Sequence, residues 1–290
     1  MKKAAILFIF LSCSFSVYGE IQTEISGYID WETMRINAEV SVDLVSAGLK
    51  LPAGRTQAES LLNEGYLNLI RSHLLSMQVD SSSTIGDLIE RGEFSLSQAD
   101  TAALGSSKVP PAMKPDMRRM AASHTIDLSN ISSALLRHNR SSPIIRTLTP
   151  VSAARYTGII IIAVENQPVY GMRGTALPVP CLFPKIWDSE MNLIYERSTL
   201  EVRNVTMAHY SKAQNIFQNN PSGLTPELQQ ITGDRPLKIF ARGVFGINPT
   251  DLIIDRSDAL IIISSEENRN LLSQGKVVII LDDSVLKYKF

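Results

Sequence analysis

Apolar residues occupy every second position from Ile36 to Leu44, and polar residues fill the positions between them. This period of two predicts a strand with one buried face and one solvated face. The preceding segment, residues 28–34, is expected to pair with it as a hairpin that turns near Glu32 and Thr33. The chain therefore opens with a predicted β-hairpin.

The period changes in residues 55–77, where apolar residues recur three, four and seven positions apart. That spacing is typical of an amphipathic helix. Two shorter helices are expected, one over 84–91 with Ser83 and Asp87 at its start, and one that begins after Ser95.

A further helix is predicted over residues 128–137, whereas the proline- and glycine-rich stretch 105–115 is expected to be a loop. The segment 141–150 carries two prolines and is interpreted as a linker. These patterns predict that the N-terminal half of the chain is predominantly helical.

The second half of the chain is richer in β-branched runs. Residues 158–164 form a continuous apolar stretch, which suits a strand that is buried on both faces. Further strands are predicted at 182–187, 193–195, 237–245, 251–254 and 276–281, and helices at 211–218 and 257–272.

The predicted fold class is α+β, with a helical N-terminal half after the initial β-hairpin and a strand-rich C-terminal half. The expected organisation is a signal peptide at 1–19, an α+β N-terminal domain at 20–145 and a β-rich α+β C-terminal domain at 151–290.

The first 19 residues have the pattern of a secretory signal peptide. Two lysines precede an apolar run that is too short to span a bilayer, and small Gly19 precedes Glu20 at the expected cleavage site. An alternative processing site is Cys13, which follows Phe10-Leu11-Ser12 in a loose lipobox and would carry a lipid anchor. The predicted location is the periplasm, or the membrane surface if Cys13 is lipidated.

Composition narrows the function classes. The chain has 290 residues, 44% hydrophobic residues and a net charge of −1, which excludes a disordered chain and gives no bulk electrostatic support to nucleic-acid binding. Two cysteines exclude a disulfide framework. Cys181 precedes Leu182 and Phe183 and is expected to be buried.

No catalytic, cofactor-binding or metal-binding pattern is found in the sequence. The four histidines, at positions 73, 124, 138 and 209, lie far apart and form no ligand array. Asp251, Asp255 and Asp258 are interpreted as strand-end and helix-capping acids. We therefore predict no cofactor, no metal and no enzymatic activity.

The sequence does contain one candidate surface for a partner. Val244, Phe245 and Ile247 lie between two predicted strands, among Gly243, Gly246 and Pro249. A partly exposed apolar hairpin tip of this kind is a candidate docking site for another protein.

Several short stretches resemble a family of secreted bacterial envelope proteins common in spirochaetes, loosely related to LPP20-type lipoproteins and to FlgT-type periplasmic flagellar proteins. The matching stretches are Tyr28–Trp31, Leu51–Arg55, Ala58-Glu59, Val79–Ser81, Tyr156–Gly158, Pro184–Asp188, Asn248–Asp251 and Asp258-Ala259. The resemblance implies an envelope location and no known catalytic residue.

The predicted function is that of a non-enzymatic exported envelope protein that binds a protein partner, in cell-envelope or flagellar assembly. One alternative is a scaffold lipoprotein anchored through Cys13. Another is a hydrolase or ligand-binding protein whose dispersed site would bring His124, His209 or Asp255 next to a nucleophile. No nucleic-acid partner is expected, and membrane contact only if Cys13 is lipidated.

Overall fold

The structure is a computed structural model of the chain. It describes residues 23–136, 138, 140–147, 154–201, 203–204 and 206–290. The predicted signal peptide, its cleavage site at Gly19 and Glu20, and the lipidation candidate Cys13 lie outside these residues.

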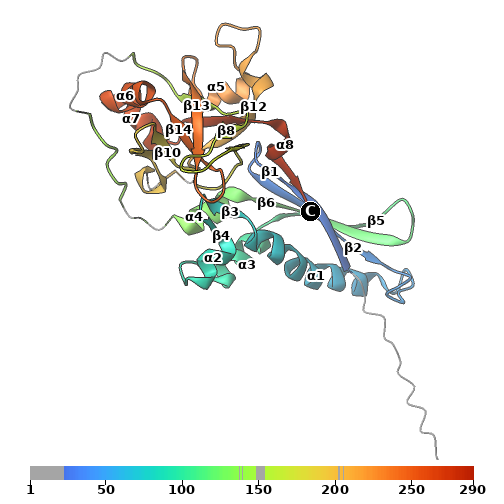
Figure 1. Cartoon of the computed structure of the whole chain (residues 1–290). Coiled ribbons are helices and arrows are strands. Elements are labelled where there is room, and N and C mark those ends of the chain that lie inside the picture. Colours follow the sequence, from blue (N-terminus) through green and yellow to red (C-terminus); the bar gives the residue numbers. More distant parts are fainter. Residues whose placement is uncertain (1–22, 137, 139, 148–153, 202, 205) are drawn as a thin grey trace, which may run out of the picture.

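The N-terminal part is an antiparallel sheet with helices packed on one face (Figure 1). Its strands are, in spatial order, β16 (Lys287–Lys289), β1 (Thr23–Asp30), β2 (Arg35–Asp43), β6 (Arg119–Asp127) and β5 (Ser107–Met113). Its helices are α1 (Arg55–Leu75), α2 (Ile85–Glu90), α3 (Leu96–Leu104) and α4 (Leu128–Leu135).

Alternation on β2 determines which face of this sheet is buried. Its inward residues from Ile36 to Val42 are at most 4% exposed, and they belong to the same core cluster as Leu62 and Ile70 of α1. The opposite face carries polar residues such as Asn37 and Glu39, which are partly exposed. The predicted hairpin and the long helix are both confirmed.

The C-terminal part is a seven-stranded mixed sheet. Its strands are, in spatial order, β11 (Leu193–Tyr195), β10 (Ile186–Asp188), β14 (Asp251–Ile254), β13 (Leu237–Phe245), β7 (Ile159–Ile162), β15 (Val277–Leu281) and β12 (His209–Lys212). The β-branched strand β7 lies between β13 and β15 and runs parallel to both, as a strand buried on both faces should.

Helices cover both faces of this second sheet (Figure 1). Ile160 and Ile162 of β7 pack in a cluster with Leu228 of α5 (Pro226–Thr232). Ile159 and Ile161 join the main core, on the side of α6 (Arg256–Ser264) and α7 (Glu266–Ser273). The predicted helix over 257–272 therefore forms, but it is divided at Ser265, which caps α7.

Short elements complete the chain. They are the hairpin β3 (Gln78–Asp80) and β4 (Ser83–Thr84), the hairpin β8 (Gln167–Pro168) and β9 (Thr175–Ala176), helix α8 (Asp283–Leu286), and 3-10 turns at Arg197–Thr199 and Ala213–Ile216.

The α+β class is confirmed, but the prediction of a helical N-terminal half is wrong, because that half is built on the five-stranded sheet. The expected loop 105–115 contains strand β5, whose two prolines are tolerated because β5 is an edge strand with a bulge between Val109 and Ala112. The helix expected over 211–218 is replaced by the end of strand β12 (His209–Lys212) and the short 3-10 turn Ala213–Ile216. The capping residue of α2 is Thr84, one residue after Ser83.

The two parts are joined by backbone pairing at two places. Strand β16, from the end of the chain, pairs with β1 and so completes the N-terminal sheet. The backbone N–H groups of Leu182 and Phe183 donate to the carbonyls of Gln78 and Val79, at 3.2 and 2.8 Å. Segments from both halves of the sequence are therefore hydrogen-bonded to each other at two separate places.

The buried carboxylate of Asp251 makes a further contact at the same junction. We call the contact of Ser81 with Gly246, Asn248 and Asp251 the latch. Ser81 Oγ donates to Asp251 Oδ2 at 3.0 Å, and the Asn248 N–H donates to the Ser81 carbonyl at 2.9 Å. Gly246 has φ +108°, and a Cβ added to it would lie 2.3 Å from Ser81 Cβ. The 246–251 turn thus fits Ser81 closely.

The carboxylate of Asp251 is fully buried, yet it has several donors. Besides Ser81, it accepts the Lys185 N–H at 3.2 Å and the Trp187 indole N–H at 3.3 Å. Burial raises the pKa of Asp251, while these hydrogen bonds oppose that rise. Thr250 Oγ1 also donates to this carboxylate, at 3.4 Å, so removing it would leave buried and part-buried donors without their acceptor.

We expect Asp251→Ala to lower the free energy of unfolding by about 3 kcal/mol, because buried donors lose a charged acceptor. Ser81→Ala removes one of these bonds and should cost about 1 kcal/mol. The matched control is Asp255→Ala, which removes a surface ion pair with Arg242 and should cost about 0.5 kcal/mol or less. Urea unfolding of the purified chain measures all three, and equal effects of Asp251→Ala and Asp255→Ala would contradict the role of the latch.

Candidate functional site

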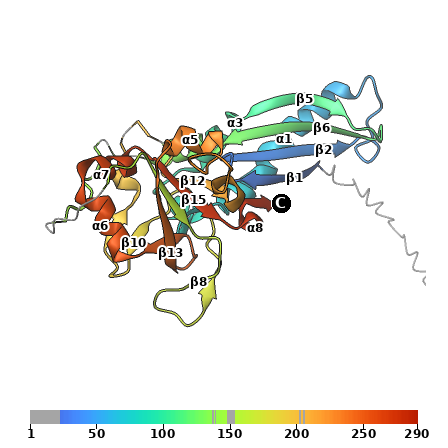
Figure 2. The same cartoon turned by 90° about the horizontal axis from the view of Figure 1, so that it is seen from above.

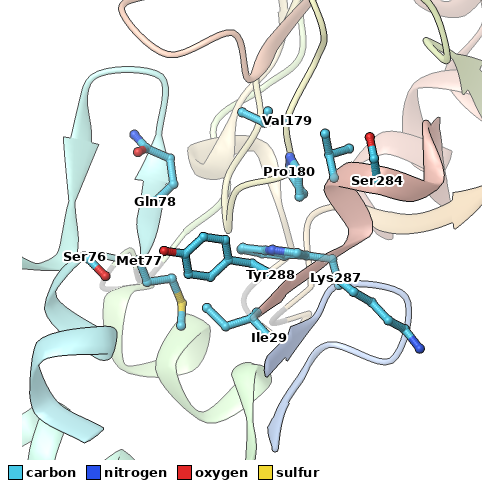
Figure 3. Close-up of a pocket in the computed structure, with 11 residues that line it drawn as sticks. Ile29, Ser76, Met77, Gln78, Val179, Pro180, Ser284, Lys287 and Tyr288 are labelled. Atoms are coloured by element: carbon cyan, nitrogen blue, oxygen red, sulfur yellow. The ribbon is translucent and has the colours of Figure 1, made fainter. Parts of the chain in front are cut away.

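A pocket of about 450 Å³ opens at the junction of the two parts (Figure 3). Four segments form its walls: the end of the β1 strand, the turn from α1 to β3, the extended segment before Cys181, and α8 with β16. Its lining residues are Ile29, Trp31, Ser76, Met77, Gln78, Val179, Pro180, Ser284, Val285, Lys287 and Tyr288.

The deeper lining of the pocket is apolar. Trp31, Met77 and Pro180 are buried, and the Trp31 ring packs edge-on against Tyr210 with 5.8 Å between ring centroids. Tyr288 is 60% exposed, and its ring extends across the pocket beside Met77 and Ile29 (Figure 3). The pocket therefore offers aromatic and aliphatic surface to a bound group.

The polar groups at the rim are bonded within the chain. Lys287 Nζ lies 3.3 Å from Asp30 Oδ2, and this neighbour raises the pKa of Lys287. Figure 3 shows the Lys287 ammonium pointing away from the pocket. Ser76 Oγ donates to the His73 carbonyl at 3.0 Å, and Ser284 Oγ donates to Asp282. These contacts leave the pocket without a facing acid–base pair.

The three residues of the predicted docking tip differ in how far they are exposed. Val244 is fully buried, pairs with Leu252 and bridges to Val169, so it presents no side chain to a partner. Phe245 is partly buried between the rings of Trp187 and Tyr170, with centroids at 5.6 and 6.0 Å. Ile247 is 80% exposed. Only Ile247 is therefore freely available at this turn.

The three aspartates singled out in the sequence, Asp251, Asp255 and Asp258, do not form one site. Asp251 belongs to the latch, Asp255 pairs with Arg242 at 2.7 Å, and Asp258 lies in the first turn of α6, where burial raises its pKa. Within the described ranges, no group of three His, Cys, Asp or Glu side chains is placed to hold a metal ion.

Cys181 is fully buried and unpaired, as the sequence predicts. Its backbone N–H donates to Tyr210 Oη at 3.1 Å, and the same hydroxyl donates to the Cys181 carbonyl at 2.8 Å. Burial raises the pKa of the thiol, so the group is a core residue in its neutral form.

One histidine lies beside a hydroxyl. Ser106 Oγ is 3.2 Å from His124 Nδ1, and the His124 ring stacks on Tyr66 with a centroid separation of 3.7 Å. However, His124 Nε2 is buried without a hydrogen-bond partner among the described residues. A serine hydrolase needs a base that a third group orients, and no carboxylate of the described residues bonds to His124.

The environment also disfavours the protonated form of His124. Burial lowers the pKa of His124 to about 4, and the charge of Lys108 acts in the same direction. A base with this pKa is far from the value that suits general base catalysis near neutral pH. The pair Ser106 and His124 therefore fits a packing role between α1 and β6.

We expect His124 to make stability depend on pH. Because its pKa in the folded chain is about 4, against about 6.5 when unfolded, the unfolded chain binds a proton between these values that the folded chain rejects. Stability is thus present above pH 6.5 and is lost as the pH falls toward 4. His124→Phe keeps a ring on Tyr66 but cannot protonate, so its free energy of unfolding should fall less steeply over this window.

Urea unfolding of both proteins at pH 7.5, 6, 5 and 4.5 measures this difference. The two proteins should have similar stability at pH 7.5 and diverge as the pH falls. Parallel curves for the two proteins would show that the buried imidazole of His124 does not carry the effect.

No helix in the described part of the chain combines the length and apolar character needed to cross a bilayer.

The sequence analysis did not predict the pocket, although one of its lining residues, Trp31, lies within a stretch that carries the family resemblance.

Comparison with protein families gives two matches. Residues 22–134 match the model of the Treponema pallidum Tp0624 N-terminal domain, and residues 158–283 match the model of the Tp0624 second domain. No curated protein matches the chain. Neither family match supports the expected relationship to LPP20-type lipoproteins or to FlgT-type proteins. The chain is therefore similar, over two successive domains, to the spirochaete-type protein family represented by Tp0624.

Proposed function

We propose that this chain is a non-enzymatic envelope protein that binds another protein, and that the pocket at the junction holds an apolar side chain of that partner. The observation that carries the proposal is the open pocket of about 450 Å³ with Trp31, Met77 and Tyr288 in its lining. Aromatic residues and methionine are enriched at protein interfaces, where an apolar centre is surrounded by a polar rim.

The polarity of the rim favours a protein segment over a small polar ligand. Sites for small molecules use a few polar groups that converge on the ligand. Here the ammonium of Lys287 and the hydroxyls of Ser76 and Ser284 are bonded to neighbouring residues of the chain. An apolar side chain buried in the pocket would leave those bonds intact.

The location of the pocket adds a structural consequence. Its walls come from both matched domains and from β16, so a bound side chain would contact the N-terminal sheet and the C-terminal part together. Binding would then favour the arrangement in which the latch is closed, because a ligand stabilises the state to which it binds.

The envelope location in this proposal comes from the signal-like residues 1–19. A role in flagellar or cell-envelope assembly, and anchoring through Cys13, belong to the same proposal. Genomic neighbourhood and fractionation of cells that carry Cys13→Ala address these points separately from the pocket.

The pocket is tested by placing a photo-crosslinking phenylalanine analogue at Tyr288 in cells that make the full chain. We expect a discrete protein adduct, because position 288 extends across the pocket. The matched control is the same analogue at Tyr170, an aromatic residue of similar exposure, 52% against 60%, that is absent from the pocket lining.

A second variant blocks the pocket without touching the core. Ser284 lies at the rim, so Ser284→Trp should fill the pocket and lower the adduct yield at position 288 by about tenfold or more, the size of an interface hot spot. Ser284→Ala should leave the yield unchanged. An adduct that resists Ser284→Trp, or the lack of any protein adduct at position 288, would overturn the proposal.

A further inference from the structure

A hairpin projects from the C-terminal sheet, and we call residues 167–176 the arm (Figure 2). It consists of β8 and β9 with a turn between them. The Val169 N–H donates to the Gly174 carbonyl at 3.2 Å, and the Tyr170 N–H donates to the Val244 carbonyl of β13 at 2.9 Å. The arm is thus fixed to β13 at the buried residue Val244, while its turn extends outward.

The turn of the arm exposes large apolar side chains. Met172 is 65% exposed and Tyr170 is 52% exposed. Gly171 and Gly174 have φ of +78° and +123°, and a Cβ added to either would meet no atom within 4 Å. The turn is therefore surrounded by open space, and its conformation favours glycine on both sides of Met172 and Arg173.

The arm carries a positive charge and no negative one. Arg173 is the single charged residue in residues 167–176, and it forms no ion pair with the residues that the structure describes. The arm therefore presents an unpaired cation next to two exposed apolar side chains.

A second hairpin turn also exposes a methionine, but it does not combine exposed apolar side chains with an unpaired cation. Met117, between β5 and β6, is 75% exposed. Its neighbours Asp116, Arg118 and Arg119 form ion pairs, Arg119 with Asp116 at 2.8 Å and Arg118 with Asp43 at 2.6 Å. That turn carries a carboxylate and compensated charges, whereas the arm carries neither.

We propose that the arm docks on the surface of an anionic lipid bilayer, with Tyr170 and Met172 entering the headgroup region and Arg173 facing lipid phosphates. Tyrosine is enriched at membrane interfaces, where its ring is apolar and its hydroxyl stays hydrated. A cation near an anionic leaflet adds electrostatic attraction. This contact is independent of the junction pocket and does not use Cys13.

The size of the turn favours a bilayer over a protein as its partner. A stable protein interface buries about 800 Å² on each side, and two exposed side chains on a narrow turn contribute only a fraction of that area. A lipid interface requires no complementary surface, so a few apolar side chains and a cation suffice for reversible binding.

Sedimentation with vesicles tests the proposal on the purified chain without residues 1–19. We expect binding to vesicles of phosphatidylcholine with 30% phosphatidylglycerol, and much weaker binding to phosphatidylcholine alone. Met172→Asp should lower the partition coefficient about tenfold or more, because it replaces an apolar side chain that would enter the bilayer with a charge of the same sign as the lipid. Arg173→Gln should lower it severalfold and reduce its salt dependence.

The matched control is Met117→Asp, which places the same charge on the other hairpin turn and should leave vesicle binding unchanged. Thermal unfolding of each variant verifies that the fold is kept, which is expected because both methionines are exposed. Equal losses in Met172→Asp and Met117→Asp, or no binding of the unmodified chain to anionic vesicles, would overturn the proposal. So would a protein adduct at position 170 in the crosslinking experiment that persists when the chain is released from membranes.

Discussion

The arrangement of the two parts depends on one buried negative charge. A carboxylate that loses contact with water must find donors in the protein, because an unpaired charge in the interior is very costly. Asp251 finds them in Ser81 of the N-terminal part and in Lys185 and Trp187 of the C-terminal part. The requirement to satisfy this single group therefore favours the closed junction over any arrangement in which Ser81 withdraws.

The junction pocket follows from that arrangement. Met77 and Gln78 precede Ser81 by only a few residues, and the Val179 N–H donates at 3.0 Å to the carbonyl of Pro249, which lies in the 246–251 turn. The same contacts that hold Ser81 thus position two of the pocket walls. A partner that fills the pocket and the carboxylate that closes the junction would act on the same equilibrium, which links binding to domain arrangement.

Hydrophobic periodicity and capping residues predicted the elements that are determined by neighbouring residues in the sequence. The alternation from Ile36 to Leu44 and the start of a helix after Ser95 both appear as expected, and Ser95 caps that helix. Strand β5 was missed because its residues are mostly exposed and two are prolines, so no periodic signal exists, and its pairing with β6 defines it. The pocket could not be predicted at all, since Trp31, Met77, Pro180 and Tyr288 come from four separate segments.

Strand β16 has a consequence for the order in which this chain can fold. Its register pairs Tyr28 with Lys289, so β1 gains its outer neighbour from residues that lie far from it in the sequence. Contacts between such distant residues slow folding, because a long loop must close before they form. Until then the edge of β1 is open to pairing with other strands, which is a known route to aggregation. In this topology the N-terminal sheet is complete only when β16 has reached β1, so its completion depends on a long-range pairing.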